Sequence, residues 1–197
     1  MMVDMCLVRA FLAIPLPQQL KDSISVIQRH LQTQIADTRW VRPENLHLTV
    51  HFFGETKQEA LEKIRVSVLS VKQCQRPFLV EVKRLGAFPN LHRPRTIWLD
   101  LEPKDQLRQL HRDFQRCLHQ VGVVAKSGSY SPHVTIGRLR QRQRPPDLTD
   151  LSNSVSLEPI GQLPVDRLVL FESRLHPDGA EHIPLLTVNF DDEISKV

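Results

Sequence analysis

The chain has 197 residues and a mass of 22.7 kDa, with 26 Lys plus Arg against 22 Asp plus Glu. Its hydrophobic fraction of 41% and charged fraction of 24% are ordinary for a globular protein, which excludes a wholly disordered chain, a collagen-like fibre and a coiled-coil rod. The formal net charge of +4 suits an anionic partner, although many enzymes carry a similar charge.

The apolar run near the N-terminus does not predict a membrane span. It covers residues 6–16 and contains Arg9, whereas a spanning helix needs ~20 apolar residues. Asp4 stands where a secretory signal carries basic residues. The cysteines are odd in number and lack CxxC spacing, so we expect buried thiols in a cytoplasmic protein. They are Cys6, Cys74 and Cys117.

Two strands and two helices are predicted in the first half of the chain. The strands end at Pro or Gly, and the helices carry apolar residues at intervals of three or four. In chain order, these elements are a strand over 7–14, a helix over 20–35, a strand over 46–53 and a helix with its apolar stripe over 61–71. Thr56 and Glu59 match the pattern of a capping box, which predicts the start of the second helix.

The second half of the chain is richer in predicted strands. They cover residues 78–85, 96–101, 132–139, 167–175 and 182–190, with a helix over 107–121. Residues 141–164 are polar and predict a loop with a short helix. Pro177, Asp178 and Gly179 suit the turn of a hairpin between the last two strands. Together, the elements predict an α+β fold with helices packed on largely antiparallel strands.

Two tetrapeptides of one pattern lie in separate predicted strands. They are HLTV at residues 47–50 and HVTI at residues 133–136. Residues i and i+2 of a strand point to the same face, so His and Thr share one face and the aliphatic residues point to the core. One copy is typical of any half-exposed strand. Two copies in the same context predict a cleft lined by two matched His–Thr pairs.

This residue set suits general acid–base chemistry. Histidine has an unperturbed pKa of about 6.5, so one ring can accept a proton while the other donates one. The threonine hydroxyls can donate hydrogen bonds to an oxygen on which negative charge develops. The sequence has no HExxH motif, Cys–His cluster, carboxylate cluster or Gly-rich phosphate loop. It therefore predicts neither a metal nor a cofactor.

The chain resembles the 2H phosphoesterase superfamily, which is defined by paired His-x-Thr/Ser-x motifs. It is most similar to the RNA 2′,3′-cyclic phosphodiesterases, also known as 2′-5′ RNA ligases. The supporting segments follow one another along most of the chain, and residues 141–160 are the least matched part. They are RAFLAI at 9–14, RWVRPENL at 39–46, HFFG at 51–54, LGAFPN at 85–90, RTIWL at 95–99, SPHVTIGR at 131–138, FESRL at 171–175 and GA at 179–180.

The resemblance implies a fold and an activity. The fold is two pseudo-symmetric lobes of antiparallel sheet with outer helices around a central cleft, in a single bilobal domain over residues 1–197. The activity is hydrolysis of RNA 2′,3′-cyclic phosphodiester ends to a 2′-phosphomonoester without a metal. A further implied activity is 2′-5′ RNA ligation, the reverse of cleavage of a 2′-5′ linkage. RNA ends or related nucleotides are the implied partners, with no membrane, and we expect a monomer.

The resemblance also implies a role for five residues. In-line attack at phosphorus needs an acid and a base on opposite sides. His47 is the implied general acid for the departing 3′ oxygen, and His133 is the implied base that activates water. Thr49, Thr135 and Arg138 are the implied ligands of the phosphate oxygens.

The position of Arg138 needs an irregular strand. It lies five residues after His133, so an unbroken strand points it away from the cleft. A bulge or a strand end near Gly137 redirects it. The surrounding arginines are either a solvated edge or a patch that faces phosphate. They are Arg138, Arg140, Arg142 and Arg144.

Other aromatic and histidine side chains are secondary candidates. His51 is either a cleft-wall or a packing residue. Three rings could stack on a base, with core packing as the alternative; they are Phe53, Tyr130 and Trp40. We expect His111 and His119 to be exposed. The other histidines have no evident partner in the sequence; they are His30, His92, His176 and His182.

Three functions remain open at this level. The first is the RNA cyclic phosphodiesterase. The second is another 2H specificity, such as ADP-ribose cyclic phosphate or 2′-5′-linked oligoadenylate. The third is a non-catalytic RNA or nucleotide binder. The two intact His–Thr pairs favour an enzyme, and a product assay on cyclic nucleotides and RNA ends separates the specificities.

Overall fold

The computed structural model describes residues 7–124, 128–140, 146–155, 159–177 and 179–190. Within them lies one nine-stranded antiparallel sheet. Its strands are β1 (Val8–Pro15), β2 (Thr38–Trp40), β3 (His47–Thr56), β4 (Phe78–Phe88), β5 (Thr96–Glu102), β6 (His133–Leu139), β7 (Gly161–Val165), β8 (Arg167–His176) and β9 (Gly179–Asn189). The helices are α1 (Gln18–Gln32), α2 (Gln58–Lys72), α3 (Lys104–Gln120) and α4 (Thr149–Val155), with a 3-10 turn η1 (Pro43–Asn45).

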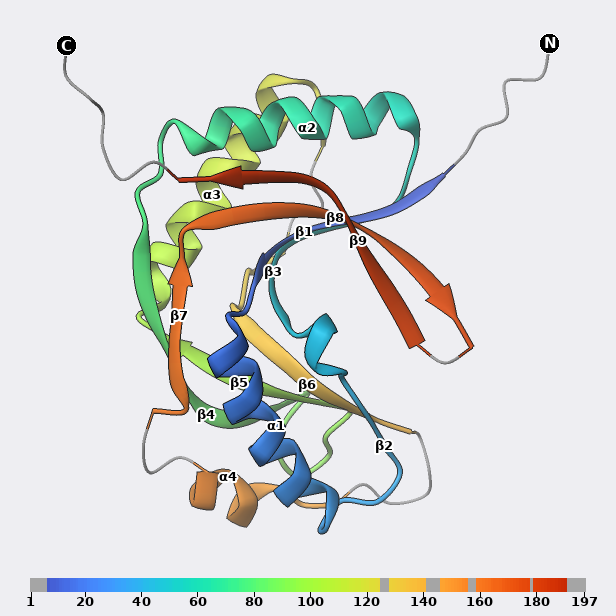
Figure 1. The fold of residues 1–197 in the computed structure, drawn as a ribbon, viewed down its shortest axis with the longest axis vertical. Coiled ribbons are helices and arrows are strands. Elements are labelled where there is room, and N and C mark those ends of the chain that lie inside the picture. Colours follow the sequence, from blue (N-terminus) through green and yellow to red (C-terminus); the bar gives the residue numbers. More distant parts are fainter. Residues whose placement is uncertain (1–6, 125–127, 141–145, 156–158, 178, 191–197) are drawn as a thin grey trace.

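The sheet consists of two halves that join at β3 and β6. The strand order is β7-β4-β5-β6-β3-β1-β8-β9, with β2 paired to β6. In one half, α2 covers β1, β8 and β9 and packs on α3 (Figure 1). In the other half, α1 contacts β7 and α4 contacts β4. This arrangement confirms the predicted α+β fold of two antiparallel lobes with outer helices.

The apolar faces of the helices and strands form the core and fix the motif strands. Leu48 and Val134, the first aliphatic residues of the two motifs, are fully buried in the core. Burial of such a side chain stabilises the fold by about 1.5–3 kcal/mol. Buried Gln28 on α1 donates hydrogen bonds to the carbonyl oxygens of Val41 and Ile136, at 2.8 and 2.9 Å. This amide therefore ties α1 to the strand that carries the second motif.

Several predicted elements differ in the structure. Strand β7 lies within the stretch that we predicted as loop and short helix, and it forms a sheet edge beside β4. Strand β2 has three residues, too few to show an alternation. The predicted capping box is wrong, because Thr56 ends β3 and Lys57 precedes α2 without a side-chain cap. The Thr56 hydroxyl instead donates to the carbonyl oxygen of Gly54 at 3.0 Å.

The two described cysteines differ in exposure. Cys74 is exposed and Cys117 partly buried, so the prediction of buried thiols is wrong for Cys74, while Cys6 lies outside the described residues. Asp178 of the predicted turn also lies outside them. No helix in the described ranges is long and apolar enough to cross a membrane. The cytoplasmic location, the monomeric state and the single domain stay predictions.

Candidate active site

The two motifs lie side by side at the junction of the lobes. Strands β3 and β6 are antiparallel, and Leu48 is the cross-strand partner of Val134. Around this pair, His47 falls beside Thr135 and His133 beside Thr49. The two histidines are therefore diagonal neighbours, a relation that places Cα atoms about 7–8 Å apart. All four polar side chains line one cavity of about 720 Å³, as the alternation predicts.

The two imidazoles are held in the same way. Nδ1 of His47 lies 2.7 Å from the carbonyl oxygen of Asn45, and Nδ1 of His133 lies 2.7 Å from that of Ser131. A carbonyl oxygen only accepts hydrogen bonds, so each Nδ1 carries the proton and donates. Nε2 of each ring is then the nitrogen available for proton transfer. In His47, Nε2 accepts a hydrogen bond from the Thr49 hydroxyl at 3.0 Å.

The surroundings of His47 favour its neutral form. Burial lowers its pKa to about 4, and the hydrogen bond to Asn45 opposes this shift. Positive charge on His182, His133 or Arg138 lowers the pKa further. An anion bound between these groups reverses the effect, because negative charge nearby stabilises the protonated ring.

His133 experiences a similar environment with one difference. Burial and the Arg138 guanidinium lower its pKa, whereas the Ser131 hydrogen bond and the Asp100 carboxylate raise it. Asp100 is the cross-strand partner of His133 on β5 and is held by Lys104 at 2.8 Å. The two motif histidines thus differ in their charged neighbours although their backbone settings match.

A bulge in β6 directs Arg138 into the cavity. Ile97 pairs with Gly137 and Trp98 with Thr135, so Ile136 is an additional residue on β6. Such a residue reverses the alternation beyond it. Arg138 consequently lines the same cavity as His133, with Nη1 3.5 Å from the Thr96 hydroxyl. The bulge predicted near Gly137 is confirmed.

Two more bulges occur in β3, and the first of them changes which aromatic ring faces the cavity. The pairing with β1 passes over Val50 and Phe53, each of which is an additional residue on β3. Phe52 therefore lines the cavity, and of the two alternatives for Phe53 the structure shows core packing. Phe53 and His51 pack instead against Phe114 of α3, with ring centroids 6.1 and 6.0 Å away. His51 is thus a packing residue.

Tyr130 supports the first motif from behind. Its ring stacks on His111 at 4.3 Å, and its hydroxyl donates to the Thr49 carbonyl oxygen at 3.1 Å. Burial raises the pKa of Tyr130, so the hydroxyl keeps its proton. His111 is buried, which overturns the prediction that it is exposed, whereas His119 is exposed as predicted. Of the three stacking candidates, Trp40 is the one that lines the cavity.

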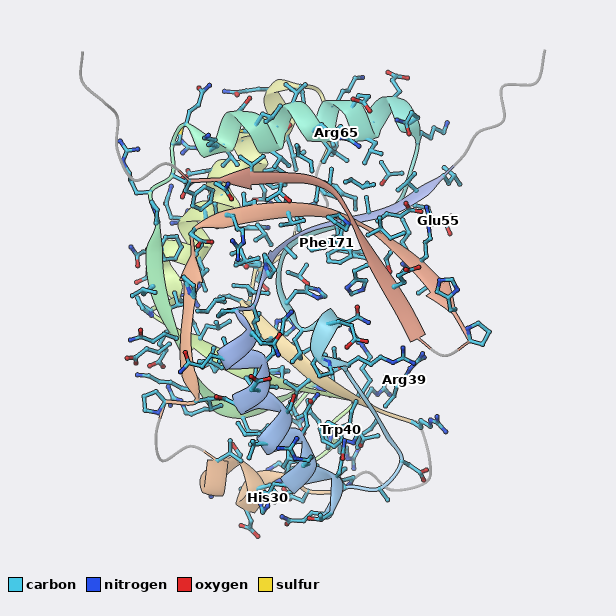
Figure 2. The ribbon with its side chains drawn as sticks, viewed as in Figure 1. His30, Arg39, Trp40, Glu55, Arg65 and Phe171 are labelled. Carbon is cyan, nitrogen blue, oxygen red and sulfur yellow. The ribbon has the colours of Figure 1, made fainter. Side chains whose placement is uncertain are left out.

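The described residues that line the cavity include four arginines and no carboxylate; the arginines are Arg9, Arg39, Arg42 and Arg138. Arg9 lies over the Phe52 ring at 5.0 Å. Figure 2 shows Arg39 and Trp40 on the α1 side of the molecule and Phe171 on the α2 side. A concave surface of this charge concentrates anions. In the predicted arginine patch, Arg140 is exposed, whereas Arg142 and Arg144 lie outside the described residues.

Sequence reasoning missed the partners of four histidines. His30, His92 and His176 lie within hydrogen-bond distance of Gln34, Asp147 and Glu181 respectively. His182 lies in the cavity, with its ring centroid 5.2 Å from that of His47. No local pattern indicates this contact, because β9 reaches the motif only through the β8–β9 hairpin.

In the described ranges, no group of three or more His, Cys, Asp or Glu side chains has a suitable arrangement for holding a metal ion.

Comparison with known proteins assigns the family. Residues 16–177 match the model of the 2′-5′ RNA ligase superfamily. The chain belongs to this superfamily. An RNA 2′,3′-cyclic phosphodiesterase of Methanothermobacter thermautotrophicus is 32% identical over 172 residues, which cover 87% of this chain and 93% of the relative. The protein of the same name from Aquifex aeolicus is 29% identical over 187 residues, 93% of this chain and 96% of the relative.

Solved structures of similar proteins confirm the fold. A crystal structure from Thermus thermophilus superposes with a TM-score of 0.77 at 22% identity, over 92% of this chain and 97% of that one. E. coli LigT in apo form gives 0.70 at 23% identity, over 93% and 97%. LigT has also been crystallised with 3′-AMP and with phosphate. The resemblance stated from the sequence is thereby confirmed at the level of family and fold.

Proposed function

We propose that this protein hydrolyses the 2′,3′-cyclic phosphodiester ends of RNA to 2′-phosphomonoesters. The observation that carries the proposal is the pair of histidines on adjacent strands. Each has its Nδ1 hydrogen-bonded to a carbonyl oxygen, which leaves Nε2 for proton transfer, and both line one arginine-lined cavity. The names of the relatives from Methanothermobacter and Aquifex support the substrate class.

The proposed reaction is an in-line displacement at phosphorus. Neutral His133 takes a proton from water through Nε2 as the water oxygen bonds to phosphorus. The bond from phosphorus to the 3′ oxygen breaks, and protonated His47 gives its Nε2 proton to that oxygen. The phosphate stays on the 2′ oxygen. In 2′-5′ ligation, a 5′ hydroxyl takes the place of water as the attacking group. That reaction is the reverse of cleavage of a 2′-5′ linkage.

The remaining polar groups bind the non-bridging oxygens. Thr49 and Thr135 donate hydroxyl hydrogen bonds, and Arg138 supplies a fixed positive charge. The sheet holds these groups in place, so they stabilise the charge that develops in the transition state with little rearrangement. The Thr49 hydroxyl only has to rotate from Nε2 of His47 to the phosphate oxygen once that ring is protonated. The phosphodiester charge raises the pKa of His47 from its low value in the free protein, which allows this ring to act as the acid.

The decisive experiment determines whether the product carries its phosphate on the 2′ or the 3′ oxygen. We expect an RNA oligonucleotide with a 2′,3′-cyclic phosphate end to yield a 2′-phosphate, identified by chromatography against 2′- and 3′-phosphate standards. His47→Ala and His133→Ala each reduce the rate by at least ~10³-fold, within the range expected for loss of a general acid or base. His119→Ala, an exposed control on α3, keeps the parent rate.

The same panel separates the alternatives. It also contains ADP-ribose cyclic phosphate and 2′-5′-linked oligoadenylate. Preference for one of these over the RNA end by kcat/KM would replace the proposed substrate. Tight RNA binding without turnover of any member would assign a binding protein instead.

A further inference from the structure

A third imidazole shares the cavity with the two motif histidines. His182 lies on β9 opposite Ser173 of β8, and both residues line the cavity. Its ring is edge-on to His47, with centroids 5.2 Å apart and an interplanar angle of 76°. Strand β9 lies at the edge of the sheet beyond β8 (Figure 1), and His182 nevertheless lines the cavity that contains the motif residues.

Apolar rings fix the orientation of His182. Its centroid lies 4.8 Å from that of Phe11 and 6.2 Å from that of Phe171. Phe11 also contacts His47 at 4.9 Å, so the two imidazoles are packed on one shared phenyl ring. Movement of His182 is thereby restricted, and its distance from His47 is set by the packing of three rings.

The nitrogens of His182 are available to a ligand. Within the described part of the chain, neither ring nitrogen has a hydrogen-bond partner, in contrast to the carbonyl-bonded Nδ1 atoms of His47 and His133. Burial lowers the pKa of His182, so the ring is neutral at neutral pH. A neutral imidazole offers one N–H donor and one acceptor.

The two sides of the catalytic pair are different because of this residue. The described rings against His133 are largely hydrocarbon, with Phe88 at 5.0 Å and Trp98 at 6.0 Å. The His47 ring contacts one phenyl ring, that of Phe11, and one imidazole, that of His182. Among the described residues, His182, whose ring nitrogens have no hydrogen-bond partner, therefore lies next to the proposed acid His47 and not next to His133. In an in-line reaction the acid lies on the side of the leaving group, which here is the ribose of the terminal nucleotide.

From this geometry we propose that His182 is a substrate-binding residue that hydrogen-bonds the terminal nucleoside on the His47 side of the phosphate. The inference rests on the proposed function for the assignment of sides. It adds a specificity-determining contact that lies outside both His-x-Thr motifs. The contact distinguishes a nucleotide from inorganic phosphate, which reaches the motif residues but leaves His182 without a partner.

Two substitutions separate hydrogen bonding from ring packing. His182→Phe keeps an aromatic ring against Phe11 and His47 but removes both nitrogens. His182→Gln removes the ring but keeps a donor and an acceptor. For adenosine 2′,3′-cyclic phosphate we expect KM to rise about tenfold in the Phe variant with kcat changed by less than about threefold, the effect of losing one hydrogen bond in binding. The Gln variant recovers most of the parent KM.

Binding measurements provide a second readout that does not need turnover. We expect calorimetry to show Kd for adenosine 2′-monophosphate about tenfold weaker in His182→Phe, and Kd for inorganic phosphate unchanged. His119→Phe on the exposed face of α3 is the matched control and leaves both values unchanged. If His182→Phe does not fold, as judged by thermal unfolding, His182→Leu replaces it in the same comparison.

The outcomes are distinct. Parent values of KM and Kd in the Phe variant would show that the ring acts by packing alone and would overturn the inference. Equal weakening of nucleotide and phosphate would also overturn it, because the contact would then be to the phosphate. A parent protein that turns over no cyclic phosphate defeats the proposed function, while the comparison of nucleotide with phosphate still decides the role of His182.

Discussion

At the residue scale, the site depends on hydrogen bonds that fix tautomers. Both motif histidines donate from Nδ1 to a carbonyl oxygen two residues earlier in the chain, at the start of their strands. The acceptor is a backbone carbonyl, so the contact needs no particular side chain at the earlier position. The same tautomer is therefore fixed in both motifs. Fixed rings reduce the reorganisation needed in the transition state.

Arg138 is the residue whose charge we expect to matter most for binding the phosphate. Arg138→Ala lowers kcat/KM by about 10²-fold, because a positive charge against the developing negative charge is lost. Arg138→Lys recovers part of the activity, since an ammonium keeps the charge but lacks the bidentate geometry. The exposed Arg140→Ala is the control in steady-state assays. Equal losses at both positions would contradict a specific role for Arg138.

The pH dependence of the rate reports the two imidazoles. We expect a bell-shaped kcat/KM profile in the free protein, because His47 with a pKa of about 4 must be protonated and His133, whose pKa is also lowered, must be neutral. The profile of kcat lies at higher pH, since the bound anion stabilises the protonated rings. Rates measured across the acidic to mildly alkaline range test this. A rate that rises continuously to high pH would exclude an acid.

At the element scale, irregularities in the strands decide which side chains meet. One additional residue in β6 turns Arg138 into the cavity, and the additional residue Val50 in β3 puts Phe52 on the cavity face. Close approach of elements matters equally. Gly86 on β4 is the cross-strand partner of Trp98 on β5, whose ring in turn contacts His133. Because Gly86 has no side chain, the Trp98 ring can lie against β4 at this position.

Substitution of Gly86 tests this arrangement. A Cβ at this position overlaps the six-membered ring of Trp98, so the ring must move. We expect Gly86→Ala to lower the free energy of unfolding by about 1–3 kcal/mol and to reduce kcat through displacement of the support of His133. Gly128→Ala, where a Cβ meets nothing within 4 Å, is the control in denaturant titrations and assays. Parent stability and rate in Gly86→Ala would refute the contact.

At the scale of the whole molecule, the buried histidines couple folding to pH. His47 and His51 both have a pKa near 4 in the folded protein because they are buried. In the unfolded chain the pKa is about 6.5. Between these values the unfolded chain binds more protons, so stability is full above about pH 6.5 and falls as the pH is lowered toward 4.

His51 allows this coupling to be measured away from the chemistry. We expect urea titrations of the parent to show a loss of stability as the pH falls from neutral toward the folded-state pKa of about 4. His51→Phe reduces that loss by up to ~2 kcal/mol, because one buried imidazole no longer resists protonation. His119→Phe keeps the parent dependence. An unchanged pH dependence in His51→Phe would show that this ring titrates normally in the folded protein.

Metal removal tests the catalytic scheme as a whole. Two imidazoles carry out both proton transfers in the proposed reaction, so we expect dialysis against EDTA to leave kcat and KM unchanged. Loss of activity that Mg²⁺, Mn²⁺ or Zn²⁺ restores would contradict that scheme. The readout is the rate on the cyclic phosphate end before and after dialysis.

The family, the fold class and the two motif strands could be predicted from the amino-acid sequence alone. This was possible because strand alternation is local: HLTV and HVTI each indicate which residues share a face, and their aliphatic members indicate which face is buried. The ordered segments from RAFLAI to FESRL extended the prediction to the whole fold. The bulge that redirects Arg138 was also predictable, because its position relative to His133 conflicts with a regular strand.

Other features of the site depend on how distant segments pack, for reasons that no local pattern contains. Phe52 faces the cavity only because β3 is irregular where it pairs with β1. His111 is buried only because α3 brings it onto Tyr130. His182 belongs to the edge strand β9, and its ring meets that of His47 only through the packing of the last hairpin beside the cavity. Contacts between elements far apart in the chain depend on the packing of whole elements, and that packing depends on every neighbour at once.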